Sequence, residues 1–120
     1  TLGDALLTVH RSYFKAVYPL LSKFDIKGMS HITGGGIEGN TMRVVPKGLT
    51  LNVDWQSWKR PFLFDLIQAA GNVPEEDMRR TFNLGLGLIM IVSPKQAAKV
   101  QALLRRKRER PIVIGDVAQS

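Results

Sequence analysis

The sequence predicts a single α/β (α+β) domain in which helices pack on a mixed sheet of four or more strands. Some segments alternate apolar and polar residues, as half-buried strands do, and others repeat apolar residues every three or four positions, as helices do. These segments follow one another in the order α-β-α-β-α-α-β-α-β. Helical crossovers of this kind bury the faces of a sheet, and the order suggests a partly ferredoxin-like topology.

The first helix is expected at residues 12–24 and the first strand at residues 28–32. The predicted core face of this helix consists of Phe14, Val17, Tyr18, Leu21 and Phe24. Pro19 removes one backbone hydrogen bond, at a cost of about 3 kcal/mol, so we expect a kink there. A short helix over residues 40–45, stopped by Pro46, follows the strand.

The remaining elements are bounded by proline and glycine. A strand is expected at residues 49–53, a helix from Pro61 to Gly71 and a short helix from Pro74. The strand predicted over residues 84–92 contains Gly85 and Gly87, which indicates that another backbone or a ligand comes close. A helix from Pro94 to about residue 107 and a strand over residues 111–115 complete the chain.

Length and composition limit the class of protein. The 120 residues are enough for one domain with its own core. There is no cysteine, so disulfides and thiolate metal sites are excluded, and no apolar run is long enough to span a membrane. Because residues 1–4 fit neither a signal peptide nor a natural start, we expect a processed chain or an excised domain.

The chain carries a net charge of +7, and its basic residues are concentrated near the end of the last helix. Five of the six residues at 105–110 are Arg or Lys. Cations there complement the helix dipole. The alternative is nucleic-acid binding, which is typical of basic surfaces with interleaved aromatic residues. No aromatic residue lies in this run, so we favour the helix terminus.

The stretch from His31 to Gly36 is the leading candidate for a binding site. A strand that runs into Gly34, Gly35 and Gly36 leaves backbone N–H groups free to bind an anion, most often phosphate. A plain tight turn is the alternative. His31 and Thr33 lie beside the turn and Arg43 follows within one short helix, which favours phosphate.

Two further groups of charged residues have competing explanations. Arg11 and Lys15 lie one helical turn apart with His10 beside them, which fits either a solvated surface or ligand binding. The three acids at residues 75–77 fit the first turn of a helix, where the dipole favours negative charge, better than a metal site. We expect no metal site in this chain.

Several motifs occur in an order that resembles a known family. They are His31-Ile-Thr-Gly-Gly-Gly-Ile-Glu-Gly-Asn40, Arg43 with Pro46, Trp58 with Pro61-x-x-Phe64, Gly71-Asn-Val73, Met78, Arg80-Thr-Phe-Asn83 and Gly85-x-Gly87. Together they resemble the C-terminal half of the phosphoribosylformylglycinamidine cyclo-ligases, also called aminoimidazole ribonucleotide synthetases. Arg11-Ser-Tyr13-Phe-Lys15 is similar to the segment that enters this domain, and the likeness covers nearly the whole chain. Val9 and Met42 stand where the family commonly has proline.

The resemblance implies one domain, residues 1–120, of a two-domain enzyme of de novo purine biosynthesis. The family uses ATP to phosphorylate the formyl oxygen of formylglycinamidine ribonucleotide, and ring closure then gives aminoimidazole ribonucleotide. ATP and Mg²⁺ would be bound mainly by an N-terminal half that is absent from this sequence, so we expect the isolated domain to be inactive. A cytoplasmic homodimer with nucleotide substrates is implied for the full-length enzyme.

The resemblance also suggests roles for matching residues. His31 would act as an acid or base, contact ATP, or simply end the strand. The Thr33 hydroxyl and the N–H groups of the three glycines suit a phosphate, with Arg43 as a clamp. The remaining candidates are Arg11 and Lys15 as a second positive contact, Asn40 and Asn83 as amide contacts, and His10; Asn83 has a helix-capping role as its alternative.

Other members of the same ATP-binding superfamily are the main alternative. Formylglycinamidine ribonucleotide synthetases, selenophosphate synthetases and hydrogenase-maturation proteins share the fold. Their usual sequences differ at His31 and at Arg80-Thr-Phe-Asn83. A basic nucleic-acid-binding module is the alternative from another class, and salt-dependent binding of random-sequence DNA would reveal it.

Overall fold

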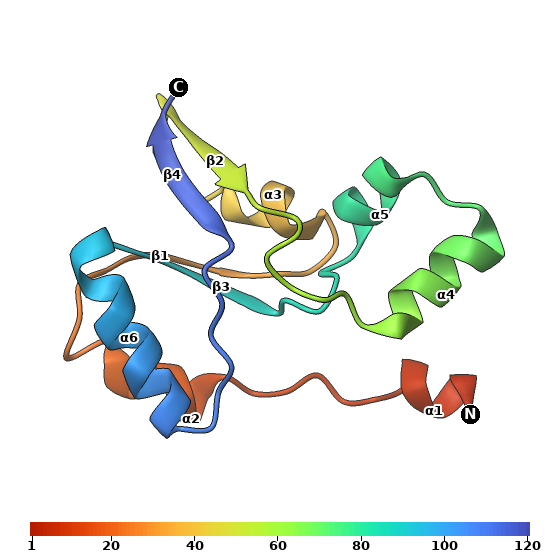
Figure 1. Cartoon of the computed structure of the whole chain (residues 1–120), viewed down its shortest axis with the longest axis horizontal. Helices are drawn as coiled ribbons and strands as arrows, with labels where there is room; N and C mark the ends of the chain where they lie inside the picture. Colours follow the sequence, from red (N-terminus) through yellow and green to blue (C-terminus); the bar gives the residue numbers. More distant parts are fainter.

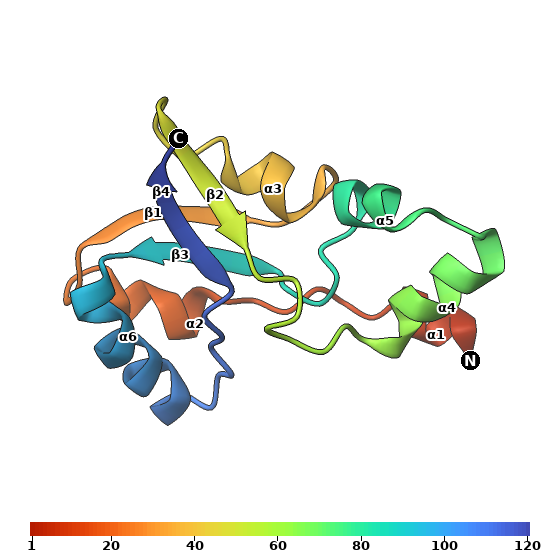
Figure 2. The same cartoon turned by 45° about the horizontal axis from the view of Figure 1, so that its top comes forward.

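Two antiparallel pairs of strands form the centre of the computed structural model, which describes all residues 1–120 (Figure 1). β1 (Ile26–His31) pairs with β3 (Leu88–Val92), and β2 (Leu49–Val53) pairs with β4 (Gly115–Gln119). No ladder joins the two pairs, and Figure 2 shows β2 and β4 crossing over β1 and β3. The mixed α/β character is confirmed, whereas the single four-stranded sheet and its ferredoxin-like topology are wrong.

The last strand explains much of this difference. It was expected at residues 111–115, but Gly115 is its first residue and lies opposite Val53 in the ladder. A Cβ atom at Gly115 would lie 1.8 Å from the carbonyl oxygen of Asn52, so glycine is the residue that lets the two backbones meet. Pro111 cannot donate a ladder hydrogen bond. The pattern of apolar residues located strands, but it did not determine which strands pair.

The helices surround these two ribbons. They are α1 (Leu2–Leu6), α2 (Phe14–Val17), α3 (Gly36–Thr41), α4 (Phe62–Gly71), α5 (Glu75–Thr81) and α6 (Pro94–Arg106), with the 3₁₀ helix η1 (Tyr18–Leu20) directly after α2. The predicted order of elements is confirmed, and α1 was not predicted. The helix expected at residues 40–45 lies earlier in the chain: α3 begins at the third glycine of the turn and ends at Thr41, so the predicted bounds are wrong. None of these helices combines the length and hydropathy needed to cross a membrane.

The first predicted helix is shorter than expected and buries a different face. The α-helix gives way to the 3₁₀ helix η1 where Pro19 lies, so the expected kink is a change of helix type. Phe14 and Tyr18 stack on each other at 5.0 Å but are 65% and 62% exposed, and Leu21 is exposed as well. The predicted stripe is therefore wrong at these three positions, because α6 packs on the face that carries Ala16.

A small core joins α2, η1 and α6 to β3. Its buried members are Ala16, Leu20, Val100 and Leu104, and the partly buried Phe24, Met90, Val92 and Leu103 pack against them. Figure 1 shows α2 and α6 side by side at one end of the strands. Apolar side chains from four elements therefore hold this end of the molecule together.

A backbone contact joins α3 to α5. Gly36, the first residue of α3, has φ 68° and lies so close to α5 that a Cβ atom would sit 1.8 Å from the carbonyl oxygen of Arg79. Ile37, which follows Gly36 on α3, and Met78, which precedes Arg79 on α5, are fully buried. Glycine is required here both by the positive φ and by the lack of space.

We expect Gly36→Ala to destabilise the domain by more than about 3 kcal/mol, because it adds a backbone clash to an unfavourable φ. Gly39→Ala is the matched control within the same helix, since its Cβ would meet nothing within 4 Å. The control should be neutral or stabilising by about 0.5–1 kcal/mol. Urea unfolding of both variants measures the difference, and equal unfolding midpoints would contradict the proposed constraint.

Candidate functional site

The side chain of Asn40 holds the glycine turn in shape. Its Nδ2 group donates hydrogen bonds to the carbonyl oxygens of Thr33 (3.1 Å), Gly34 (3.3 Å) and Gly36 (2.7 Å). Its Oδ1 atom accepts a hydrogen bond from the Thr33 hydroxyl at 3.3 Å. Asn40 is only 4% exposed. Its amide is therefore occupied within the turn, and a contact with substrate would require some of these bonds to break.

Two of the three glycine N–H groups remain available for a ligand. Gly36 donates its N–H to the carbonyl of Thr33 at 3.2 Å, whereas Gly34 and Gly35 donate no backbone hydrogen bond. Gly35 has φ 103°, in the left-handed region. Because the carbonyls are turned toward Asn40, the turn combines internally bonded acceptors with free donors, as the sequence-based hypothesis of an anion contact requires.

A pocket of about 300 Å³ lies beside the turn. It is lined by His10, Ile32, Thr33, Gly34, Phe64, Thr81, Phe82 and Asn83. Four of the predicted site residues, His10, Thr33, Gly34 and Asn83, thus come together from three distant parts of the chain. Asn83 also accepts a hydrogen bond from the N–H of Gly85 at 2.9 Å, so it shapes the turn that leads into β3.

His31 joins this group through His10. The two imidazole rings meet edge to face, with their centroids 4.9 Å apart. Gly87 leaves room for the side chains of Tyr13 and His10, since a Cβ atom there would lie 2.2 Å from Tyr13 Oη and 3.2 Å from His10 Cε1. The sequence predicts that another backbone or a ligand comes close to the glycines of this strand. The groups that come close are instead side chains, Pro61 at Gly85 and Tyr13 with His10 at Gly87, and both glycines lie before β3.

The three predicted cationic contacts lie outside this pocket. Arg11 donates two hydrogen bonds of 2.7 Å to the carboxylate of Glu109 and lies over the ring of Tyr13. Its guanidinium therefore anchors the N-terminal segment to the chain beyond α6. Lys15 is exposed on α2 and Arg43 is exposed beyond α3. Neither forms an ion pair, and Arg43 is not paired with Asp54.

Four pocket residues are not among the site residues that the sequence predicts: Ile32, Phe64, Thr81 and Phe82. Phe64 and Phe82 lie with their ring centroids 5.6 Å apart, and Thr81 precedes Phe82 at the end of α5. All four belong to motifs that carry the family resemblance, which is the signal that could have identified them. Aromatic spacing alone does not separate a core residue from a pocket residue.

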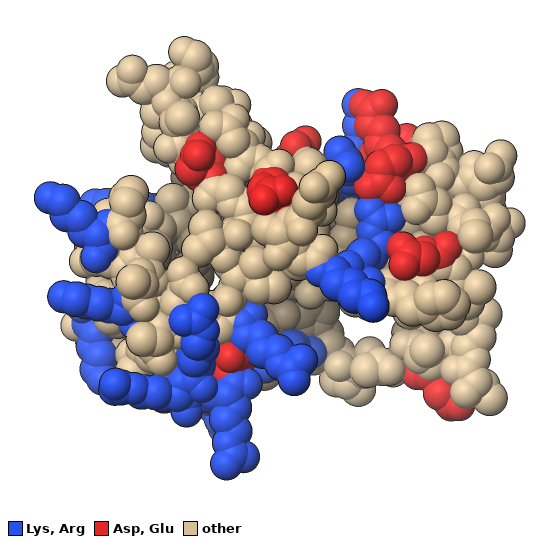
Figure 3. Space-filling model, in the orientation of Figure 1, with Lys and Arg blue, Asp and Glu red and all other residues tan.

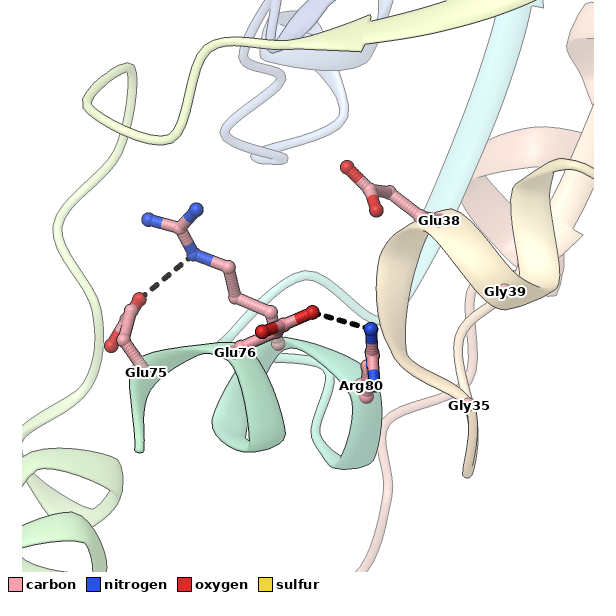
Figure 4. Close-up of a pocket in the computed structure, with 7 residues that line it drawn as sticks. Gly35, Glu38, Gly39, Glu75, Glu76 and Arg80 are labelled. Carbon is pink, nitrogen blue, oxygen red and sulfur yellow. Dashed lines mark hydrogen bonds and ion pairs between the residues drawn. The ribbon is translucent and has the colours of Figure 1, made fainter. Parts of the chain in front are cut away.

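A polar cleft of about 670 Å³ lies between α3 and α5. Its lining, Gly35, Glu38, Gly39, Glu75, Glu76, Arg79 and Arg80, contains no hydrophobic residue. Figure 4 shows Glu75 paired with Arg79 and Glu76 paired with Arg80 along α5, facing Glu38 on α3. Arg79 also lies over the ring of Trp55, 4.4 Å from its centroid. The charges on α5 are therefore largely satisfied by one another.

Glu75 is the centre of these interactions. It accepts hydrogen bonds from both terminal nitrogens of Arg60, from Arg79 and from Gln68. The Arg60 guanidinium is the largest cause that lowers the pKa of Glu75 from 4.5 to about 2. The three acids lie in the first turn of α5 as predicted, and two of them, Glu75 and Glu76, are paired with arginine side chains. No group of three or more His, Asp or Glu side chains is arranged to hold a metal ion.

The basic run lies where α6 ends, as predicted. Arg105 and Arg106 form the last turn of the helix. Figure 3 shows Lys and Arg side chains gathered over the end of the molecule that contains α6, whereas the end with α1 and α4 is mostly uncharged with a few acidic side chains. This placement agrees with complementation of the helix dipole.

Comparison with known proteins connects this geometry to a family. All residues 1–120 match the family described as AIR synthase related protein, C-terminal domain. The chain is 42% identical over 118 residues to a phosphoribosylformylglycinamidine cyclo-ligase of Desulfitobacterium hafniense, which covers 98% of this chain and 35% of that protein. The cyclo-ligase of Syntrophotalea carbinolica is 39% identical over 120 residues, or 100% of this chain and 34% of that protein. The chain thus spans about a third of the length of these relatives.

We expect Glu75 to make the stability of the domain depend on pH. The folded-state pKa of Glu75 is lower than its ordinary value, so its stabilising effect is present above about pH 4.5 and is lost as the pH falls toward 2. Because the Glu75 side chain is 42% exposed, screening limits this effect to on the order of 1 kcal/mol. Glu75→Gln should lower the free energy of unfolding at pH 7 and reduce its change between pH 5 and pH 2.

Glu76→Gln is the control, because it removes a neighbouring carboxylate whose only partner is the exposed Arg80. Its effect at pH 7 should be smaller. Urea unfolding at several pH values measures both variants. If the two variants were indistinguishable across this range, Glu75 would have no special role.

Proposed function

The chain belongs to the family of AIR synthase related proteins, C-terminal domain, and from this membership we propose that it is the C-terminal domain of an ATP-dependent cyclo-ligase. The complete polypeptide would convert formylglycinamidine ribonucleotide to aminoimidazole ribonucleotide in purine biosynthesis. The observation that carries this proposal is the match of the entire chain to relatives named as cyclo-ligases, at 39–42% identity. A cytoplasmic homodimer is the corresponding proposal for the full-length enzyme.

The pocket beside the glycine turn is the proposed contribution of this domain to the site. The free N–H group of Gly34, which lines this pocket, would contact a phosphate of the nucleotide substrate or the transferred phosphoryl group. Gly35 lines the neighbouring polar cleft, and the Thr33 hydroxyl would have to release its hydrogen bond to Asn40 before it could donate to the phosphate. Arg43 lies outside this pocket, so its proposed role as a phosphate clamp requires the arginine to reach toward the substrate in the complete enzyme. Asn40 supports these groups by fixing the turn.

The paired imidazoles suit the proton transfers of ring closure. When the amidine nitrogen attacks the activated formyl carbon, it must lose a proton, and an imidazole can accept a proton near neutral pH. His31 is exposed beside the pocket and contacts His10. We propose His31 as the acid or base. ATP and Mg²⁺, bound by the rest of the polypeptide, would supply phosphoryl activation.

The test is turnover by the complete polypeptide encoded by the gene. With ATP, Mg²⁺ and formylglycinamidine ribonucleotide, we expect ADP and aminoimidazole ribonucleotide at on the order of 1 per second or faster. The 120-residue chain alone should give no turnover. Failure of the complete polypeptide to form the imidazole product would refute the proposed function, and normal turnover by the isolated chain would refute the need for the missing part.

His31→Gln in the complete polypeptide should reduce kcat/KM by roughly 10²- to 10⁴-fold, the range that loss of a general acid or base produces. The melting temperature should remain within about 1–2 °C, because His31 is exposed and a surface substitution typically changes stability by less than about 0.5 kcal/mol. Steady-state kinetics and thermal melts measure the two effects. Unchanged kinetics would mean that His31 has no catalytic role and only forms the last residue of β1.

A further inference from the structure

The helix α4 is strongly apolar but buries none of its residues. Its sequence, Phe-Leu-Phe-Asp-Leu-Ile-Gln-Ala-Ala-Gly, has seven apolar side chains among the first nine positions, and no residue of the helix is buried. Phe62 is 75% exposed, and Leu66 is exposed as well. A surface helix of a complete fold normally buries one apolar stripe. In α4 the apolar residues Leu63, Phe64 and Ile67 are only half-buried, so this chain covers the apolar side chains of the helix incompletely.

The N-terminal segment adds to the same uncovered area. α1 also buries none of its residues, and Leu2, Leu6, Leu7 and Val9 are all exposed, Val9 by 87%. Figures 1 and 2 both show α1 next to α4, at the end of the molecule opposite α6. We call these residues, together with Phe62 and Leu66, the α1–α4 surface. Exposed apolar patches of this kind mark interaction sites.

Three observations indicate what covers this surface. The relatives are about three times longer than this chain, and the matching family is described as a C-terminal domain, so their additional length lies largely before it. The first residues of this chain are themselves part of the α1–α4 surface. A segment preceding Thr1 would therefore enter the molecule at this surface.

We propose that the α1–α4 surface docks the part of the complete polypeptide that precedes Thr1. The inference rests on the proposed function, in which this chain is one part of a longer enzyme. His10 and Phe64 follow closely on the surface residues Val9 and Phe62 in the sequence, and both line the pocket. The docked part therefore lies next to the pocket and determines how His10 and Phe64 are held there.

Hydrogen–deuterium exchange of the 120-residue chain and of the complete polypeptide tests this proposal. The amides of α1 and α4 should exchange about tenfold or more slowly in the complete polypeptide, because docking restricts local opening. The amides of α6 should exchange at the same rate in both proteins, since α6 packs within this chain. Equal exchange of α4 in the two proteins would overturn the proposal.

A pair of double variants separates docking from folding. Phe62→Ser with Leu66→Ser should abolish the additional protection in the complete polypeptide without changing the melting temperature of the 120-residue chain, because both side chains are already exposed. Ile112→Ser with Val113→Ser is the control, since these side chains are exposed on the segment before β4. This control should retain the protection of α4. Loss of protection in both double variants would overturn the proposal.

Sedimentation of the 120-residue chain tests the alternative occupant, a second copy of itself. We expect a monomer at micromolar concentration. A dimer that Phe62→Ser with Leu66→Ser dissociates would assign the surface to self-association and overturn the proposal. The activity assay is independent of these measurements: protection of α4 in an inactive complete polypeptide would refute the cyclo-ligase function and retain the docking.

Discussion

The contact between Gly36 and the backbone carbonyl of Arg79 determines how the two halves of the candidate site face each other. At this contact the backbones of α3 and α5 meet with no side chain between them. Any residue other than glycine at position 36 would force the two helices farther apart. The polar cleft lies between these helices, and the pocket takes Thr81, Phe82 and Asn83 from the end of α5 and the chain beyond it. The absence of a Cβ atom at Gly36 thus contributes to the geometry of both the polar cleft and the pocket.

Two parts of the site are held in different ways: the glycine turn is held by residues close to it in the sequence, whereas the position of His10 depends on a residue far along the chain. Asn40 ties three carbonyls of the glycine turn together from within α3, so the turn is fixed locally. His10 instead lies on a segment whose fixed points are the side chains of Arg11 and Tyr13. Since Arg11 pairs with Glu109, 98 positions along the chain, the position of His10 depends on the chain beyond α6.

The local elements could be predicted from the sequence, whereas most of their partners could not. The strand at residues 49–53 was predicted from the alternation of apolar and polar residues, and several helix ends were predicted from proline and glycine. These signals depend only on residues close together in the sequence, and the predictions agree with the structure. Strand pairing, the buried face of α2 and the Arg11–Glu109 pair depend on residues far apart in the sequence. The glycine turn was recognised for its conformational freedom, but the bonds of Asn40 and the space required at Gly36 emerge only when α3 and α5 are folded. The glycines before β3 predict a close approach by another backbone or a ligand, whereas the side chains of Tyr13 and His10 lie against Gly87, because the pattern shows where space is needed and not which group fills it.

The unequal packing of the two ends of the molecule has a consequence for the pocket. Four elements share an apolar core around α6, so that end is stabilised within these 120 residues. The end with α1 and α4 contributes Phe64, and its neighbouring segment contributes His10, yet α4 buries no residue of its own. Segments with few buried contacts open at low free-energy cost. The glycine turn is therefore a preformed half of the site, whereas we expect the aromatic half to become more rigid when the exposed face of α4 is covered.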